Sequence, residues 1–132
     1  MASADDRIID HYKHPRHKGT LATPTVRKRD VNPFCGDEVT IELLIEDDQI
    51  VDAAFDGRGC SLSLATASIL LDEIVGKPTA EVNAWGQKEL LDLLEIEIGP
   101  VRQKCALLPL NVLHACLDEG ESTTNKEDEL NE

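Results

Sequence analysis

The chain of 132 residues has few aromatic residues, little positive charge and no long hydrophobic run. Only 3% of its residues are aromatic, so we expect a core made of aliphatic side chains. The formal net charge of -13 argues against nucleic acid and anionic membranes as partners, because both require a basic face. A protein partner with a basic surface suits this charge better.

Targeting segments are also lacking. No apolar run reaches the roughly eighteen residues that indicate a transmembrane helix, and the first residues show no basic stretch followed by an apolar one. These absences predict a soluble cytoplasmic protein. Thiols stay reduced in that compartment, so the four cysteines indicate metal or redox chemistry before they indicate disulfides.

The residue pattern predicts one folded domain over residues 1–117 and a disordered acidic tail over residues 118–132. The tail consists almost entirely of Asp, Glu, Ser, Thr, Asn and Lys, too polar to offset the entropy lost on ordering. Inside the domain, apolar and polar residues alternate over 39–46, which predicts a strand with one wet face. A turn would lead to a paired strand over 50–56, with an expected inward set of Val51, Ala53 and Phe55.

Helices are expected around these strands. A short helix reaches Tyr12, and another strand is expected over 25–30. The stretch after Cys60 is apolar on all sides and rich in small residues, which predicts a helix buried against the sheet. Shorter helices are expected over 79–85 and 87–94, followed by a helix over 100–117 in which Pro109 predicts a kink or a break.

Three cysteines and one aspartate occur in unlike local settings that suggest a metal site. Cys35 and Asp37 flank a single glycine, Cys60 follows Gly57-Arg58-Gly59, and Cys105 follows Lys104. Three thiolates and one carboxylate would make a four-coordinate site suited to zinc or iron. Cys105 lies near the expected start of the last helix, where the helix dipole, Arg102 and Lys104 favour its thiolate.

These residues occur in blocks that resemble the U-type iron-sulfur cluster assembly scaffolds, which comprise the ISC-type scaffold (IscU), the SUF-type SufU and the amino-terminal domain of NifU. The resemblance covers about residues 7 to 117. Its blocks are Ile9 to Arg16, Asn32 to Asp37, Phe55 to Ser63, Gly76-Lys77 and Lys104 to Leu108.

The resemblance implies an α+β fold, with helices packed on one face of a three-stranded antiparallel sheet. It implies that Cys35, Asp37, Cys60 and Cys105 gather at one exposed end, binding zinc in the isolated protein and iron or a [2Fe-2S] cluster transiently. The implied partners are a cysteine desulfurase and apo iron-sulfur recipient proteins. Cys105 and Cys35 are the candidate persulfide acceptors, with Lys104 tuning the site.

The chain departs from the ISC type in two places. Lys104 stands where the ISC-type scaffold carries a histidine, as it does in SufU, although the short segment from Cys60 to Cys105 resembles the ISC type. The Leu-Pro-Pro-Val-Lys motif that docks an Hsp70-type chaperone appears only as Gly99-Pro100-Val101-Arg102-Gln103, which leaves use of that chaperone in doubt.

Four functions therefore compete. The favoured one is a scaffold that accepts sulfur from a cysteine desulfurase, assembles a [2Fe-2S] cluster and passes it on, rather than a conventional enzyme. The alternative is a SufU-like zinc-dependent sulfurtransferase that relays persulfide sulfur. A structural zinc module is disfavoured because Cys-x-x-Cys knuckles are absent, and a Cys-His hydrolase because no histidine context matches. Cys116 has no motif and is expected in the core, and His11 is expected to be structural.

Overall fold

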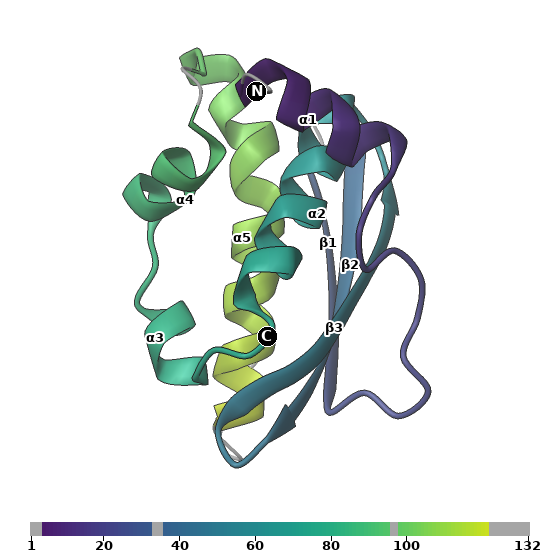
Figure 1. Cartoon of the computed structure of the whole chain (residues 1–132), viewed down its shortest axis with the longest axis vertical. Coiled ribbons are helices and arrows are strands. Elements are labelled where there is room, and N and C mark those ends of the chain that lie inside the picture. The colour runs from purple at the N-terminus through teal and green to yellow at the C-terminus, as the bar shows by residue number, and fades with distance from the viewer. Residues whose placement is uncertain (1–3, 33–35, 96–97, 122–132) are drawn as a thin grey trace.

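The computed structural model describes residues 4–32, 36–95 and 98–121 as an α+β fold. Three antiparallel strands form one sheet in the order β1 (Val26–Asn32), β2 (Asp37–Glu46) and β3 (Gln49–Arg58). The helices are α1 (Ala4–Lys13), α2 (Ser61–Ile74), α3 (Thr79–Asn83), α4 (Gln87–Leu94) and α5 (Pro100–Glu121). They gather on one side of the sheet (Figure 1), which confirms the expected fold class.

The inward face of the sheet is aliphatic, as the low aromatic content predicts. Val39, Ile41 and Leu43 of β2 are fully buried, and Ile41 lies opposite Phe55 of β3. β2 and β3 are joined by Asp47 and Asp48, whose φ angles of 53° and 62° are both positive. A two-residue turn of this hand matches the twist of the paired strands and fixes their register.

One residue of the expected inward set, Val51, faces away from the core. Ala53 and Phe55 are buried, but Val51 is 46% exposed and Ile50 is buried in its place. The ladder between β2 and β3 shifts register between Leu44 and Ile45. A shift of one residue moves a side chain to the opposite face of a sheet, so strict alternation over 50–56 mispredicted Val51.

The polar face of β2 is more deeply buried than its residue types suggest. Thr40 and Glu42 are only 9% and 7% exposed. The segment before β1 runs along the outer edge of β3, where the N-H of Gly19 donates to the carbonyl of Phe55. The N-H of Leu21 then donates to Glu42 over 2.7 Å. This segment therefore lies over part of the outer face and pairs with the edge of β3 at Phe55.

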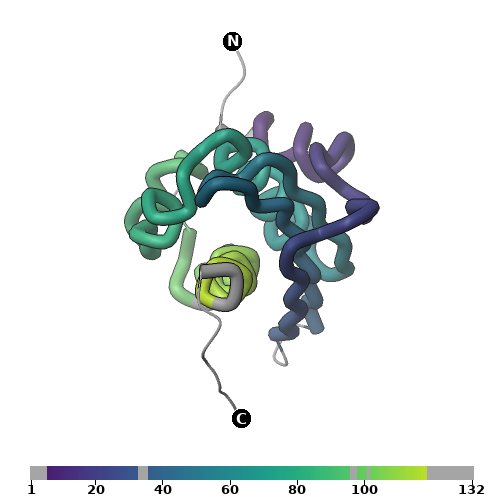
Figure 2. The backbone as a smooth tube through the Cα atoms, turned by 90° about the horizontal axis from the view of Figure 1, so that it is seen from below, coloured from purple at the N-terminus to yellow at the C-terminus, as the bar shows by residue number. Residues whose placement is uncertain are grey.

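The other elements form an arc around α5 that is open on one side (Figure 2), and α5 contacts α2, β1 and β2. Ten of the fourteen residues of α2 are buried, and its small side chains allow this close packing. The starts of α2 and α5 lie toward the same end of the molecule (Figure 1). No helix in the described part of the chain is long and apolar enough to cross a membrane.

Of the kink or break expected at Pro109, the break does not occur. α5 continues through Pro109 and ends at Glu121, four residues beyond the expected end at residue 117. The missing N-H of Pro109 would leave the carbonyl of Cys105 without its helical donor, and the hydroxyl of Ser63 donates to that carbonyl instead. Residues 122–132 lie outside the described ranges, so a disordered tail there stays a prediction.

Candidate metal centre

Asp37 is a buried carboxylate at the first position of β2. Only 1% of the residue is exposed, so its charge depends on hydrogen-bond donors or a cation. The backbone N-H of Cys60 donates to Oδ1 over 2.8 Å, and the hydroxyl of Ser63 donates to Oδ2 over 2.6 Å. The start of β2 is thereby tied to the start of α2.

Cys60 is the N-cap residue of α2, and Gly59 alone separates it from the end of β3. Its side chain makes no capping bond to the helix, and its Sγ lies 3.5 Å from Oδ2 of Asp37. A thiol at a helix N-terminus lies at the positive end of the helix dipole, which favours its thiolate. α2 has no acidic residue in its first turn to oppose this effect.

Cys105 completes the described group from the second turn of α5. Cys105 is 9% exposed, whereas Arg102 and Lys104 beside it are exposed. One ligand atom from each of Asp37, Cys60 and Cys105 lies within 4.8 Å of the others. Three elements that are distant in sequence therefore bring two thiols and a carboxylate together, and these are three of the four candidate ligands.

The fourth candidate, Cys35, belongs to residues 33–35, which lie outside the described ranges. Its place in the site stays a prediction that rests on its separation by one residue from Asp37. Lys104 is exposed at the edge of the group, and its tuning role is untested. Cys116 does not join the group: it is fully buried, and its thiol donates to the carbonyl of Ile41 over 3.5 Å.

Zinc fits these donors. Zinc binds thiolates at about 2.3 Å and carboxylates at about 2.0–2.2 Å, so tetrahedral ligands lie roughly 3.3–3.8 Å apart. The 3.5 Å between Cys60 Sγ and Asp37 Oδ2 is in that range. All three ligand atoms lie within 4.8 Å of one another, so small side-chain rotations would bring them to the distances of a tetrahedral site. Two soft sulfur atoms with one oxygen suit either zinc or iron.

Ser63 is the residue of this site that sequence reasoning missed. It is fully buried, and its Oγ lies within 3.6 Å of atoms from Asp37, Cys60 and Cys105. One signal was present, because Ser63 follows Cys60 by three residues on a helix and therefore lies on the same face. In a helix so rich in small residues, that serine could not be distinguished from other buried serines such as Ser68.

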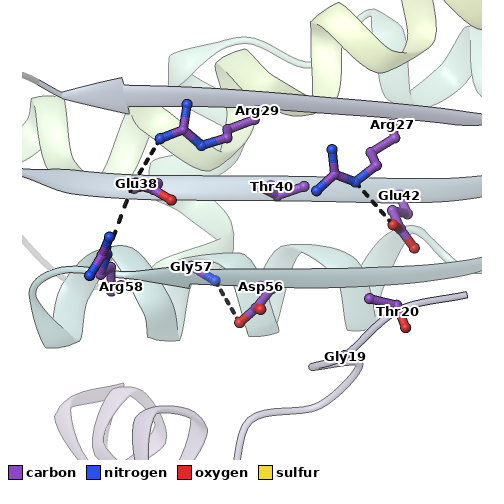
Figure 3. Close-up of a pocket in the computed structure, with 10 residues that line it drawn as sticks. All are labelled: Gly19, Thr20, Arg27, Arg29, Glu38, Thr40, Glu42, Asp56, Gly57 and Arg58. Atoms are coloured by element: carbon purple, nitrogen blue, oxygen red, sulfur yellow. Dashed lines mark hydrogen bonds and ion pairs between the residues drawn. The ribbon is translucent and has the colours of Figure 1, made fainter.

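A concave region separate from this group lies on the outer face of the sheet. It has a volume of about 410 Å³ and contains charged residues from all three strands (Figure 3). Arg29 approaches Glu38 to 2.9 Å, and Arg27 approaches Glu42 to 3.2 Å. The hydrogen bond from Arg29 lowers the pKa of Glu38 below its ordinary value. These charges neutralise one another, and none of the described residues that line the pocket is a cysteine, so we interpret it as a solvated sheet face.

Comparisons with known proteins identify relatives of this chain. The chain is 44% identical to the zinc-dependent sulfurtransferase SufU of Bacillus subtilis (strain 168), over 80% of this chain and 83% of that protein. It is 38% identical to the iron-sulfur cluster assembly scaffold protein IscU of Thermotoga maritima, over 85% of this chain and 90% of that protein.

Solved structures with a similar fold are also found. A putative iron-sulfur cluster assembly scaffold protein for the SUF system from Fervidobacterium islandicum AW-1 superposes with a TM-score of 0.73 and 27% identity, covering 85% of this chain and 94% of that one. Residues 3–127 match the model of the NifU-like N terminal domain. The expected resemblance is confirmed, and this chain belongs to the NifU-like N-terminal domain family.

Proposed function

We propose that this protein is an iron-sulfur cluster assembly scaffold that accepts sulfur from a cysteine desulfurase, assembles a [2Fe-2S] cluster and passes it to recipient proteins. The observation that carries the proposal is the convergence of Asp37, Cys60 and Cys105 within 4.8 Å. Thiolates hold iron strongly, and a carboxylate is a harder and more exchangeable ligand. Such a mixed set can bind a cluster and release it.

Cys35 would complete the ligand set. It is the natural fourth donor because it precedes Asp37 by two residues, and Cys116 is committed to the core. Zinc, when bound by the same residues, would hold the thiols deprotonated at neutral pH. Other groups of the chain position and activate these ligands. The Cys60 N-H and the Ser63 hydroxyl orient Asp37, and the N-terminus of α2 favours the Cys60 thiolate.

Sulfur transfer from a desulfurase persulfide needs one nucleophilic thiolate of this chain. That thiolate attacks the outer sulfur of the persulfide, a new S–S bond forms on the scaffold, and the old S–S bond breaks as the desulfurase cysteine leaves as a thiolate. Cys105 suits this step, because it lies beside the exposed cations Arg102 and Lys104 and retains a small exposed fraction. Reduction and iron are then needed to convert persulfide sulfur into cluster sulfide.

A zinc-dependent sulfurtransferase is the second candidate. Two observations favour it: the 44% identity to a protein of that name, and Lys104 immediately before Cys105. In that function Cys35 would carry the persulfide and relay it. In either function the proposed partners are a cysteine desulfurase and apo-protein recipients, and the proposed location is the cytoplasm.

Mapping the sulfur distinguishes the two candidates. The zinc-loaded protein is incubated with a cognate desulfurase and cysteine, and the added sulfur is located by peptide mass. Sulfur on Cys105, followed by a cluster when iron and reductant are supplied, supports the scaffold. Sulfur on Cys35, with strong stimulation of the desulfurase and no cluster, would establish the relay instead. A Cys116→Ala protein is the control, because this buried thiol should carry no sulfur in either case.

A further inference from the structure

Ser63 touches every described member of the metal centre. Its Oγ lies 2.6 Å from Oδ2 of Asp37, 3.0 Å from the backbone carbonyl of Cys105 and 3.6 Å from Sγ of Cys60. The residue is fully buried, so water does not compete for its hydroxyl. A polar side chain in such a place acts on the groups it bonds.

Pro109 explains why the carbonyl of Cys105 is one of those groups. In an α-helix the N-H of each residue donates to the carbonyl four residues earlier. Pro109 has no N-H, and the residue four positions before it is Cys105. The hydroxyl of Ser63, on α2, takes the place of that helical donor. A bond between two helices thus replaces a bond within α5 at the residue that carries a candidate ligand.

The hydroxyl of Ser63 has one hydrogen and faces two oxygen acceptors. An ionised carboxylate and a backbone carbonyl both accept hydrogen bonds and donate none. Ser63 therefore shares its hydrogen between Asp37 and Cys105 and holds both at fixed distances. Removing the hydroxyl would take one hydrogen bond from the side chain of Asp37 and one from the backbone of Cys105 at the same time.

We infer that Ser63 is a positioning residue of the metal centre. It orients Asp37 as a ligand. Its hydrogen bond to the carbonyl of Cys105, which replaces the helical donor that Pro109 lacks, fixes the turn of α5 that carries Cys105. This inference rests on the metal centre of the proposed function. Hydrogen-bonded partners of metal ligands commonly contribute about 10–100-fold to metal affinity. Ser63 forms hydrogen bonds to two candidate ligand residues, so we expect its removal to reduce metal affinity by at least the lower end of that range.

Ser68 provides a matched control on the same helix. It is also a fully buried serine, but its hydroxyl bonds Nδ1 of His11 and the N-H of Arg16, each over 2.7 Å. Its contacts tie α2 to α1 and the segment after it rather than to the metal centre. Ser63→Ala and Ser68→Ala therefore remove equivalent groups from one helix, and only Ser63→Ala touches the candidate ligands.

The test is a zinc titration against a chromophoric chelator, with unfolding of the zinc-free proteins measured in parallel. Ser63→Ala should bind zinc about tenfold more weakly or worse, whereas Ser68→Ala should keep the zinc affinity of the parent. Cobalt in place of zinc should show an altered visible spectrum in Ser63→Ala alone. Parent-like zinc affinity in Ser63→Ala, or equal losses in the two variants, would overturn the inference.

Pro109→Ala tests the part played by the carbonyl. Alanine restores the helical N-H to Cys105, so this variant should fold and bind zinc at least as tightly as the parent. In its background, Ser63→Ala should reduce zinc affinity by a smaller factor than in the parent, because only the bond to Asp37 is lost. Equal factors in both backgrounds would overturn the link through Cys105. This background also keeps the test usable if Ser63→Ala alone does not fold.

Asp37→Ala separates failure of this inference from failure of the proposed function. If Asp37→Ala weakens zinc binding and Ser63→Ala does not, the metal centre stands and the role of Ser63 falls. If neither variant changes zinc affinity, the ligand assignment itself is wrong, and the inference falls with it.

Discussion

The carboxylate of Asp37 lies where a side chain on Gly59 would have to be. A Cβ on Gly59 would collide with Oδ1 of Asp37 and lie 2.7 Å from its Cγ. Gly59 also has a φ of +148°, which side-chain-bearing residues rarely adopt. The loop between β3 and α2 thus needs glycine at this position for the carboxylate to reach the N-H of Cys60.

Gly59→Ala should damage both the fold and the metal centre. We expect a loss of about 1–3 kcal/mol in the free energy of unfolding from backbone strain, together with a fall in zinc affinity as Asp37 is displaced. Gly76→Ala is the matched control, because Gly76 has a φ of +95° with no atom within 4 Å of the added Cβ. It should lose stability and keep its zinc affinity, as measured by denaturant unfolding and chelator competition. Equal zinc affinities in the two variants would contradict this account.

Cys60→Ser tests the ligand assignment. A serine hydroxyl is a poor ligand for zinc compared with a thiolate, so the isolated variant should contain much less than one zinc per chain. Cys116→Ala, which removes a buried thiol that bonds Ile41, should retain the zinc content of the parent. Metal analysis of the purified proteins measures both. Full zinc content in Cys60→Ser would remove Cys60 from the ligand set.

Asp37→Ala should slow the release of an assembled cluster. The carboxylate is the exchangeable ligand of the proposed set, and without it three thiolates hold the cargo. The rate at which a reconstituted cluster moves to an apo-ferredoxin measures this effect. Transfer at the parent rate would show that Asp37 does not act as a leaving ligand.

Acid should destabilise the protein through His11. Burial, followed in size by the charges of Arg16 and Arg7, lowers the pKa of His11 below its ordinary value of 6.5. The unfolded chain therefore binds a proton at a pH where the folded protein does not. Stability from the neutral His11 is fully present above pH 6.5 and is lost as the pH falls from 6.5 toward the lowered pKa.

A His11→Gln variant should lack this component of the pH dependence. Denaturant unfolding of the zinc-free parent and variant between pH 7.5 and 5.5 compares the two, with zinc removed so that proton competition at the metal ligands does not contribute. Parallel pH profiles for parent and variant would refute the assignment to His11.

Local residue patterns were enough to predict the sheet and the helices that pack on it. Alternation along β2 placed Val39, Ile41 and Leu43 on the buried face, and the small residues after Cys60 indicated the buried helix α2. Val51 was mispredicted, because the register shift near Leu44 depends on how two strands meet. Alternation within one strand carries no information about such a shift.

The candidate ligands could be predicted from sequence motifs, but the residue that holds them in place could not. Asp37, Cys60 and Cys105 stood out because of their neighbours in sequence. The role of Ser63 depends on a carbonyl 42 residues away that Pro109 deprives of its helical donor. Pro109 was accordingly expected to kink or break the helix, since the hydroxyl that compensates for its missing N-H belongs to another helix.

The central claim is that this protein assembles a cluster, and cluster formation tests it most directly. The protein is incubated without oxygen with a cysteine desulfurase, cysteine, ferrous iron and a thiol reductant while its visible absorption is recorded. The account predicts sulfide-to-iron absorption on the parent, its loss in Cys60→Ser and Cys105→Ser, and its movement to an added apo-ferredoxin. Stimulated desulfurase activity with no iron-sulfur absorption on the parent would contradict the account.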